Sequence, residues 1–483
     1  MELDPKLPPY STADPTSFAW PTARERWPVI ITQAIDDTYR TVGSCDDAAK
    51  QEEGKKIVAE LARLKYEVQH DRPLTPIRDD GYPDVAGYNK ELEQLGPITW
   101  LNAPWLFTEC YLFRRMSTSF TLSTHWKNYD VFARQKIKTF RSSRPAVLEL
   151  AARYKDLVTQ LRSQKQSAAT ADQQQQEDAD ALLFTEMCEV CLWGNATDLS
   201  LLTSLTYEDI QKLQGSEARR QAEKNILIND LPQVYSHLRA AAAKSANGGN
   251  KERRVDIVLD NAGFELYVDL VLAGYLLSAG LATTVVLHPK SIPWFVSDVL
   301  PGDFASLLNA LANPRAFYET PTDEDELQGR KPEKLTDAQA GELAFLFEEW
   351  SRFHAEGQLV LRPNRVWTGP GSFWRLPAEA KELVEDLKQA ELVVFKGDLN
   401  YRKLVGDVAW DPTTPFTDAL GPLGPGSGLN ILALRTCKAD VVVGLKPGED
   451  EKLRQTEGGG GDSGARKWAW SGKWAVVSFS KGK

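Results

Sequence analysis

The chain has 483 residues, of which 57 are Lys or Arg and 67 are Asp or Glu, so its formal net charge is −10. This acidic balance argues against a nucleic-acid binder, because neutralising a phosphate backbone takes a basic face. No apolar run is long enough to span a membrane, and the acidic, proline-rich first residues lack the apolar stretch of a secretory signal. Five cysteines are typical of a reducing compartment. We therefore expect a cytoplasmic or nuclear protein that binds neither membrane nor nucleic acid.

The first half of the chain is predicted to be helical. After an extended arm over residues 1–22, apolar residues recur at the spacing of amphipathic helices through residues 27–161. Residues 163–180 are polar and contain four consecutive Gln, so they form an insertion that is either disordered or loosely helical. The helical pattern resumes over residues 181–243. We therefore expect an N-terminal helical domain that spans residues 1–243.

The second half changes character after a linker at residues 244–254. Short β-branched runs alternate there with helical stretches, which predicts an α/β fold with a mostly parallel sheet covered on both faces. We expect a C-terminal α/β/α three-layer domain over residues 244–483, with insertions at 320–342 and 455–466. The expected strands are Val255–Leu259, Thr283–Leu287, Leu359–Leu361, Leu392–Phe395, Val441–Leu445 and Trp474–Phe479.

An Asp–Asn pair marks the sharpest local motif. Asp260 and Asn261 come directly after the apolar run Val255–Leu259. In open α/β sheets, ligands bind at the carboxyl ends of the strands, and hard divalent cations prefer carboxylate and amide oxygens. The same two side chains are also suited to cap the helix that follows, so both interpretations stay open here.

Two further segments suit an anionic ligand. Residues 396–403 (KGDLNYRK) follow another apolar run, and Gly397 allows a close approach of the backbone to a ligand. Arg435 and Lys438 lie three residues apart, just before the expected strand Val441–Leu445, and paired cations at a sheet edge suit a phosphate. Taken singly, either segment can also be ordinary surface charge.

Other chemistries have little support in the sequence. Cys188 and Cys191 form a lone CxxC pair on one face of a predicted helix, and we interpret them as buried thiols rather than zinc ligands. The five histidines are scattered, and no GxSxG segment is present to hold a nucleophilic serine.

Taken together, the motifs resemble the damage-control phosphatase family of metal-dependent sugar-phosphate phosphatases. Within that family, the chain is most similar to the subfamily also described as acidic-residue methyltransferase-like. The resemblance covers most of the chain, and the insertions fall between its motifs. It rests on Arg26–Pro28, Pro104–Arg115, Trp193–Ser200, Asp260–Glu265, Ile292–Asp298, Lys396–Leu404 and the Arg-Thr-x-Lys signature at Arg435–Lys438.

The resemblance implies roles for individual residues. It places a divalent metal, with Mn²⁺ first and Mg²⁺, Co²⁺ or Ni²⁺ as alternatives, on Asp260, Asn261 and Asp298, which are also the catalytic residues. Asn195 and Asp198 belong to a further family motif that we expect to face the sheet edge from the N-terminal domain. The implied substrate-binding residues are Asp260, Asn261, Asp398, Leu399, Asn400, Tyr401, Arg402 and Lys438.

The implied activity is hydrolysis of small sugar phosphates, with fructose 1-phosphate and fructose 6-phosphate first, by a metal-activated water. The charges are consistent with this activity, because Asp260 and Asp298 neutralise one divalent cation. Lys438, together with Arg402 or Lys396, can then offset a phosphate.

Three alternatives remain at this stage. Asp260 can be a covalent nucleophile, but such phosphatases need a second Asp two residues on, where this chain has Ala262. An S-adenosylmethionine-dependent protein glutamate carboxyl methyltransferase is disfavoured, because the turn after the first strand carries only Gly263. The third alternative is a non-catalytic sugar-phosphate sensor. The sequence leaves the oligomeric state open.

Overall fold

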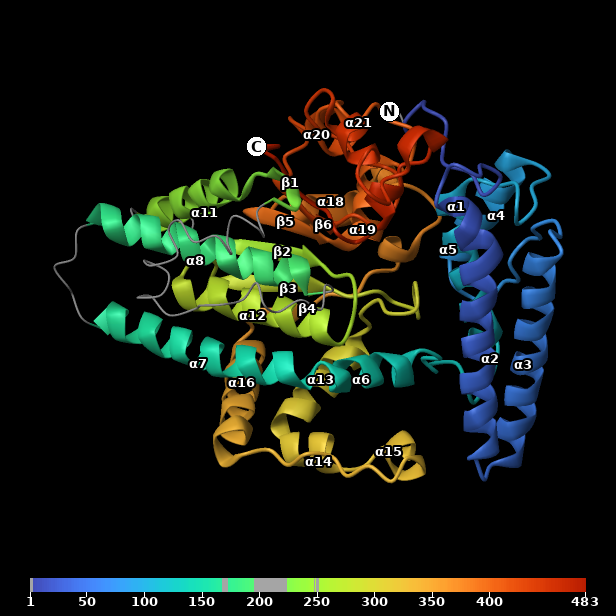
Figure 1. Ribbon diagram of the computed structural model, residues 1–483, viewed down its shortest axis with the longest axis horizontal. Coiled ribbons are helices and arrows are strands. Elements are labelled where there is room, and N and C mark those ends of the chain that lie inside the picture. Colours follow the sequence, from blue (N-terminus) through green and yellow to red (C-terminus); the bar gives the residue numbers. More distant parts are fainter. Residues whose placement is uncertain (1–2, 167–172, 195–223, 247, 249–251) are drawn as a thin grey trace.

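The computed structural model describes residues 3–166, 173–194, 224–246, 248 and 252–483, and its centre is a single sheet (Figure 1). The described residues form seven strands in the order β1-β7-β6-β5-β2-β3-β4. The strands are β1 (Ile226–Asn229), β2 (Arg254–Val258), β3 (Thr284–His288), β4 (Leu359–Leu361), β5 (Leu392–Lys396), β6 (Ile431–Thr436) and β7 (Ala475–Ser480).

The sheet is mostly parallel, as the alternating pattern predicts. All neighbouring strands run parallel except β6 and β7, which pair antiparallel. Every residue of β2 and β5 is buried, which is typical of parallel strands with helices on both faces. Ile257 and Val394 pack into one core, whereas Val258 and Phe395 pack into the core on the opposite face. The predicted α/β architecture is therefore confirmed.

Helices cover both faces of this sheet. Those that pack on the first face are α7 (Arg144–Gln166), α8 (Gln173–Trp193), α11 (Leu231–Ala246), α12 (Phe264–Ala279), α13 (Pro301–Ala312) and α16 (Asp337–Ala355). Those on the second face are α17 (Leu376–Glu379), α18 (Lys381–Leu387), α19 (Gly397–Val405), α20 (Phe416–Ala419) and α21 (Glu449–Arg454). The short helices α14 (Pro314–Glu319) and α15 (Asp323–Leu327) follow α13 in the chain.

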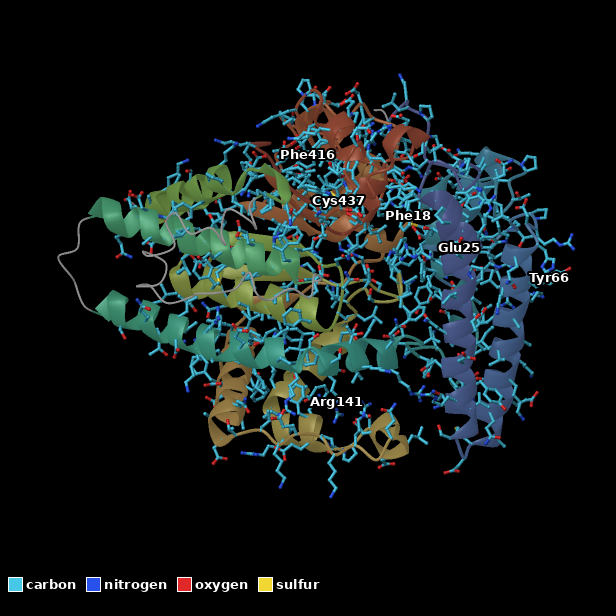
Figure 2. All side chains as sticks on the ribbon, in the orientation of Figure 1. Phe18, Glu25, Tyr66, Arg141, Phe416 and Cys437 are labelled. Carbon is cyan, nitrogen blue, oxygen red and sulfur yellow. The ribbon has the colours of Figure 1, made fainter. Side chains whose placement is uncertain are left out.

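The first part of the chain forms a helical region beside the sheet (Figure 1, blue). Ile292, Trp294 and Leu399, from the sheet half of the chain, belong to the hydrophobic core of this region. In Figure 2, Tyr66 lies on the outer side of this region, whereas Phe18 lies on the side of the C-terminal half. The helices are α1 (Ala19–Pro21), which continues into a π-helical stretch (Thr22–Arg26), α2 (Trp27–Gly43), α3 (Ala48–Gln69), α4 (Asp84–Leu95) and α5 (Trp105–Thr121). Helix α6 (Ala133–Ser142) follows them in the chain but packs on the first face of the sheet, where Phe140 joins the core.

Two segments differ from their predicted secondary structure. Val441–Leu445 is buried but forms no strand, and the strand of this region is instead β6, which ends at Thr436. Residues 226–229 form β1, although the sequence predicts helix throughout residues 181–243. The domain boundary between residues 243 and 244 stays a prediction, but β1 shows that the sheet takes in residues from both sides of it.

The insertions are only partly irregular. The described parts of residues 163–180 belong to α7 and α8, which supports the helical alternative. Residues 320–342 contain α15 and the start of α16, and residues 455–466 form a loop with one 3₁₀ turn at Gly461–Ser463. Among the helices of the described residues, none is long and apolar enough to cross a bilayer.

Candidate functional site

The backbone brings Asp260, Asn261 and Asp298 to one edge of the sheet. Asp260 and Asn261 follow β2, and Asp298 lies in the segment after β3, the parallel neighbour of β2. Asn261 and Asp298 form an isolated antiparallel β-bridge. Val299 N–H donates to the Asp260 carbonyl at 2.8 Å, and Ala262 N–H donates to the Ser297 carbonyl at 2.6 Å. The three implied metal ligands therefore lie on two backbone segments that are hydrogen-bonded to each other.

Neither side chain of the Asp–Asn pair caps the next helix. The N-cap of α12 is Gly263, with no side-chain cap hydrogen bond. Asn261 Nδ2 instead donates to Asp260 Oδ2 at 2.8 Å and to Glu265 Oε2 at 2.7 Å, and Ser297 Oγ donates to Asn261 Oδ1 at 2.5 Å. The capping interpretation is therefore not supported, because the Asn261 side chain instead links Asp260, Glu265 and Ser297.

The carboxylates of this site are short of positive charge. Burial raises the pKa of Asp260 well above its ordinary value, and the nearby Glu265 and Asp298 carboxylates raise it further. Burial also raises the pKa of Asp298 to about 7, although the ammonium of Lys290 acts in the opposite direction. Oδ2 of Asp298 is buried and accepts no hydrogen bond. Closely spaced buried acids of this kind suit a bound cation.

The donor set fits a hard divalent cation rather than zinc. No group of three or more His, Cys, Asp or Glu side chains that could hold a metal occurs among the described residues. Asp260 and Asp298 offer carboxylate oxygens and Asn261 offers an amide oxygen, so water would have to complete the coordination. Such an oxygen-rich set favours magnesium or manganese over thiolate-bound metals.

Gly397 is packed directly against Asp260. It has a φ of +83°, and a Cβ built on it would lie 1.9 Å from Asp260 Oδ2. Only glycine fits a position that requires both a left-handed backbone and this contact. The sequence predicted that the backbone at Gly397 approaches another group closely. In the structure, that group is the Asp260 carboxylate.

The implied substrate segment, residues 398–402, is the first part of helix α19 rather than a loop. Its side chains largely hold the helix in place. Asn400 Nδ2 donates to the Lys396 carbonyl at 2.7 Å, Tyr401 Oη accepts from Val443 N–H at 3.2 Å, and Leu399 packs into the core of the helical region. The backbone N–H groups at the start of α19 receive no side-chain cap and remain available to an anion.

Two of the expected phosphate-binding cations are already paired. Arg402 donates to Glu109 at 2.9 Å and to Asp407 at 2.8 Å. Lys396 Nζ lies 3.2 Å from Asp269 Oδ1 and is almost fully buried. Neither side chain therefore has spare charge for a phosphate.

Lys438 differs from these cations. It is half-buried, its backbone N–H donates to Asp398 Oδ1 at 2.9 Å, and its ammonium makes no hydrogen bond or ion pair to the described residues. Its charge also acts to lower the pKa of Asp260, so the side chain lies near that carboxylate. Lys438 is the cation of the Arg-Thr-x-Lys signature that can meet a substrate.

Arg435 of the same signature is structural. Its Nε donates to Asp398 Oδ1 at 2.8 Å, and its other nitrogens donate to the carbonyls of Ala439 and Val441. The guanidinium also lies over the ring of Tyr401, 4.2 Å from its centroid. These contacts fix the segment that carries Lys438, and Cys437 between them is buried in the C-terminal half (Figure 2).

Lys290, at the base of the loop that carries Asp298, is a site residue that the sequence did not reveal. Lys290 N–H donates to the Val299 carbonyl at 2.7 Å and closes the loop at its base. Inside it, Phe295 and Val296 have φ values of 43° and 71°, which bulky residues rarely adopt and which often mark functional segments. The side chain of Lys290 points back to the site. The one signal for Lys290 in the sequence is its position two residues after an apolar strand.

The CxxC pair behaves as predicted. Cys188 and Cys191 are buried, and burial raises the pKa of the Cys191 thiol well above its ordinary value. Cys191 Sγ donates to Asp269 Oδ1 at 3.0 Å. Asn195 and Asp198 lie outside the described residues, so their expected place near the sheet edge stays a prediction.

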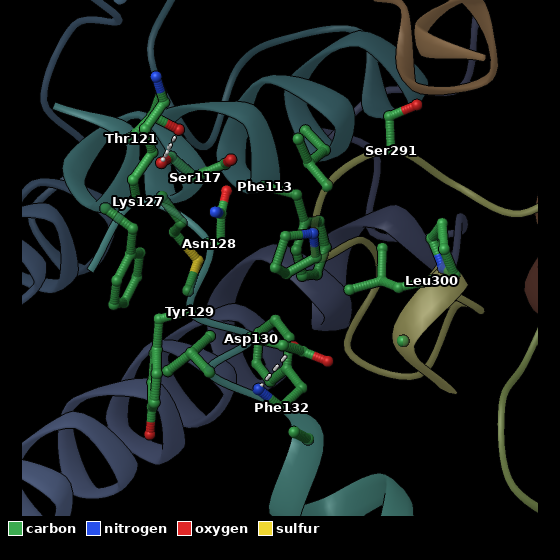
Figure 3. A pocket seen from close by; sticks show the side chains of 18 of the residues that line it. Phe113, Ser117, Thr121, Lys127, Asn128, Tyr129, Asp130, Phe132, Ser291 and Leu300 are labelled. Atoms are coloured by element: carbon green, nitrogen blue, oxygen red, sulfur yellow. Dashed lines mark hydrogen bonds between the residues drawn. The ribbon is translucent and has the colours of Figure 1, made fainter. Parts of the chain in front are cut away.

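A cavity of about 530 Å³ is lined by residues of α5, of the segment that follows it and of α13 (Figure 3). Phe113 and Ser117 of α5, Asn128, Ser291 and Leu300 are among its lining residues. None of the predicted site residues lines it. This cavity is therefore distinct from the candidate metal site.

Comparison with known sequences shows the family of the chain. The model of the damage-control phosphatase ARMT1-like domain matches residues 22–453. The chain is 34% identical to the damage-control phosphatase ARMT1 of Danio rerio, over 99% of both chains, and 34% identical to that of Xenopus laevis, over 96% of both. It is 31% identical to the Homo sapiens protein of the same name, over 97% of both chains. The chain therefore belongs to the ARMT1-like damage-control phosphatase family.

Proposed function

We propose that the protein is a metal-dependent phosphatase that hydrolyses small sugar phosphate monoesters, with fructose 1-phosphate and fructose 6-phosphate as first candidates. Membership of the family supports a phosphatase of metabolite repair. The observation that supports the metal is the buried pair Asp260 and Asp298, of which only Asp298 forms an ion pair, with Lys290, among the described residues.

Asp260, Asn261 and Asp298 would hold the metal, with Mn²⁺ first and Mg²⁺, Co²⁺ or Ni²⁺ as alternatives. A divalent cation there would polarise a phosphoryl oxygen and lower the pKa of a bound water. Gly397 and Asn261 fix the Asp260 carboxylate from two sides, and the loop that begins at Lys290 presents Asp298. The protein thus supplies oxygen ligands whose positions are set before the metal arrives.

The phosphate would lie between the start of α19 and Lys438. The uncapped N–H groups of Asp398 and Leu399 suit an anion, because the helix dipole is positive at that end. The Asp398 side chain faces Arg435 and the Lys438 backbone, so its role is to hold Lys438 in place. Lys438 then supplies the charge that Arg402 and Lys396 cannot.

Asp260 is better placed as a ligand than as a covalent nucleophile. Its Oδ2 accepts a hydrogen bond from Asn261 and packs against Gly397. The position two residues on, where a general acid would stand, is Ala262 and is buried. We therefore propose attack by water rather than by Asp260.

A phosphate-release screen over sugar phosphates, with each divalent metal in turn, tests this function. We expect release that depends on metal and is abolished in Asp260→Asn. Asp450→Asn is the matched control, because Asp450 is also buried but pairs with Arg454 and Arg466 away from the site. Absence of release from every substrate, combined with labelled methyl transfer to protein glutamates, would instead identify the methyltransferase alternative.

A further inference from the structure

Lys290 is a fully buried lysine at the centre of the site. Its Nζ donates to the Leu259 carbonyl at 2.7 Å and to Asn400 Oδ1 at 3.2 Å. The same atom lies 3.4 Å from Asp298 Oδ2, and the side chain is 0% exposed. Lys290 therefore joins the end of β2, helix α19 and the loop that carries Asp298.

Each of these contacts bears on an implied metal ligand. Leu259 directly precedes Asp260, so its carbonyl fixes the backbone from which the Asp260 carboxylate projects. Asp298 Oδ2 accepts no hydrogen bond, and the Lys290 ammonium is the cation with which it forms an ion pair. Asn400 also donates to the Leu259 carbonyl, at 3.1 Å. Lys290 thus contacts the backbone that carries Asp260 and the carboxylate of Asp298 itself.

Two buried carboxylates at one sheet edge repel each other, and a low-dielectric interior strengthens that repulsion. Lys396 does not relieve it, because that ammonium is shared between Asp269, Glu265 and the Cys191 carbonyl. Lys438 is half-buried and forms no ion pair with the described carboxylates. The charge that faces Asp298 at close range is that of Lys290.

We propose that Lys290 is a positioning residue, an internal counter-cation that holds the two metal-ligand carboxylates in place while the metal is absent. This proposal rests on the proposed metal site. When the metal binds, it takes over the neutralisation of Asp260 and Asp298. Lys290 therefore contributes most to the stability of the metal-free protein, and bound metal partly compensates for its removal.

Thermal unfolding with and without MnCl₂ tests the proposal on Lys290→Met. The matched control is Lys403→Met. Lys403 is also buried and donates to one carbonyl, that of Gly369 at 2.7 Å, but forms no ion pair with the described carboxylates. Both variants lose a buried hydrogen bond and should unfold about 5 °C or more below the wild type without metal.

The response to metal separates the two variants. Mn²⁺ should raise the melting temperature of Lys290→Met by about 3 °C or more beyond its effect on the wild type, because it supplies the missing charge. Lys403→Met should respond as the wild type does. An equal or smaller rise in Lys290→Met would overturn the proposal. If no divalent metal raises the melting temperature of the wild type, the metal site itself is refuted.

A second variant guards against misfolding. Lys290→Gln keeps a donor for the Leu259 carbonyl but removes the charge, so it should show the same enhanced response to Mn²⁺. In the metal-free protein, adding Asp298→Asn to Lys290→Met should raise the melting temperature above that of Lys290→Met alone, since the unpaired carboxylate is gone. Additive losses in the double variant would contradict the pairing.

Discussion

At the scale of single residues, the site depends on the absence of a side chain at one position. Gly397 lets the turn between β5 and α19 pass against Asp260, and a Cβ there would overlap the carboxylate. Because the oxygen that it would displace belongs to an implied metal ligand, the glycine is a requirement of the site as well as of the turn.

Gly397→Ala should therefore lose metal affinity and activity together, with kcat/KM at least about 10-fold lower. Gly448→Ala is the control, because Gly448 has nearly the same φ of +81° with no atom within 4 Å of the added Cβ. Both variants pay about 1–2 kcal/mol for the left-handed backbone, but only Gly397→Ala moves Asp260. Calorimetric titration with Mn²⁺ compares them, and equal affinities would contradict this role of Gly397.

Lys438→Ala should leave metal affinity nearly unchanged and weaken substrate use. The ammonium has no protein partner among the described residues, so its removal costs little stability. Loss of a charge-assisted contact to phosphate costs about 1.5–3 kcal/mol, or roughly 10–100-fold in kcat/KM. Lys438→Arg should not fully restore the rate, because a planar fork places its donors differently. An unchanged kcat/KM in Lys438→Ala would mean that the phosphate is bound elsewhere.

At the scale of elements, β6 and α19 are joined by Arg435. Its guanidinium reaches Asp398 at the start of α19 and two carbonyls in the segment after β6. The strand end, the helix start and the Lys438 segment are therefore held by one buried side chain.

Arg435→Met should lower the free energy of unfolding by about 3–5 kcal/mol, because it leaves Asp398 without its buried partner. Arg63→Met is the comparison, since the Arg63 side chain is exposed, lies 3.7 Å from Glu67 and should cost less than about 1 kcal/mol when removed. Denaturant unfolding measures both. Similar losses in the two variants would show that the Arg435 network contributes little.

The sequence located β2, β3, β4, β5 and β7 to within one residue at each end, whether or not every residue of the strand is buried. β2 and β5 were found within one residue, because Val, Ile and Phe in short runs suit a parallel strand. Val441–Leu445 has the same composition but is held by Arg435 and Tyr401 rather than by a neighbouring strand. β6 was missed because its sequence, ILALRT, also suits a helix. Tertiary contacts decided both cases.

The site residues were predictable where polar side chains come directly after a predicted strand. Asp260 and Asn261 met that condition, and the resemblance added Asp298. The pairing of Arg402 with Glu109 and Asp407 was not predictable, because Glu109 lies 293 residues away in the chain and only the fold brings it to Arg402. Lys290 was missed for the same reason, since its partners come from β2, α19 and its own loop.

At the scale of the whole molecule, the N-terminal arm is tied to the C-terminal half through Asp440. This buried carboxylate accepts hydrogen bonds from Ser17 Oγ and Phe18 N–H, both at 2.9 Å, and from Trp470 Nε1 at 2.8 Å. Phe18 also stacks on Trp470, with ring centroids 5.2 Å apart. Distant parts of the sequence thus meet at one ionisable group.

Stability should change with pH through Asp440. Burial raises its pKa to about 6, above the unfolded value near 4. The folded state therefore binds the proton more tightly, and this stabilisation is complete below about pH 4 and lost as pH rises through 6. The stability advantage of the wild type over Asp440→Asn should shrink by roughly 2–3 kcal/mol between pH 4 and 7. A constant difference across that range, in unfolding measured at each pH, would contradict this.

The place of β7 in the sheet has a consequence for how the protein is made. β7 lies between β1 and β6, although residues 226–229 leave the ribosome long before residues 475–480. Until β7 emerges, β1 has no neighbouring strand and β6 presents an open edge, which is a hazard for aggregation. The earlier helices can pack during synthesis, but the β1–β7–β6 part of the sheet cannot form until β7 has been synthesised. A nascent chain stalled before residue 475 would therefore depend on chaperones to shield that edge.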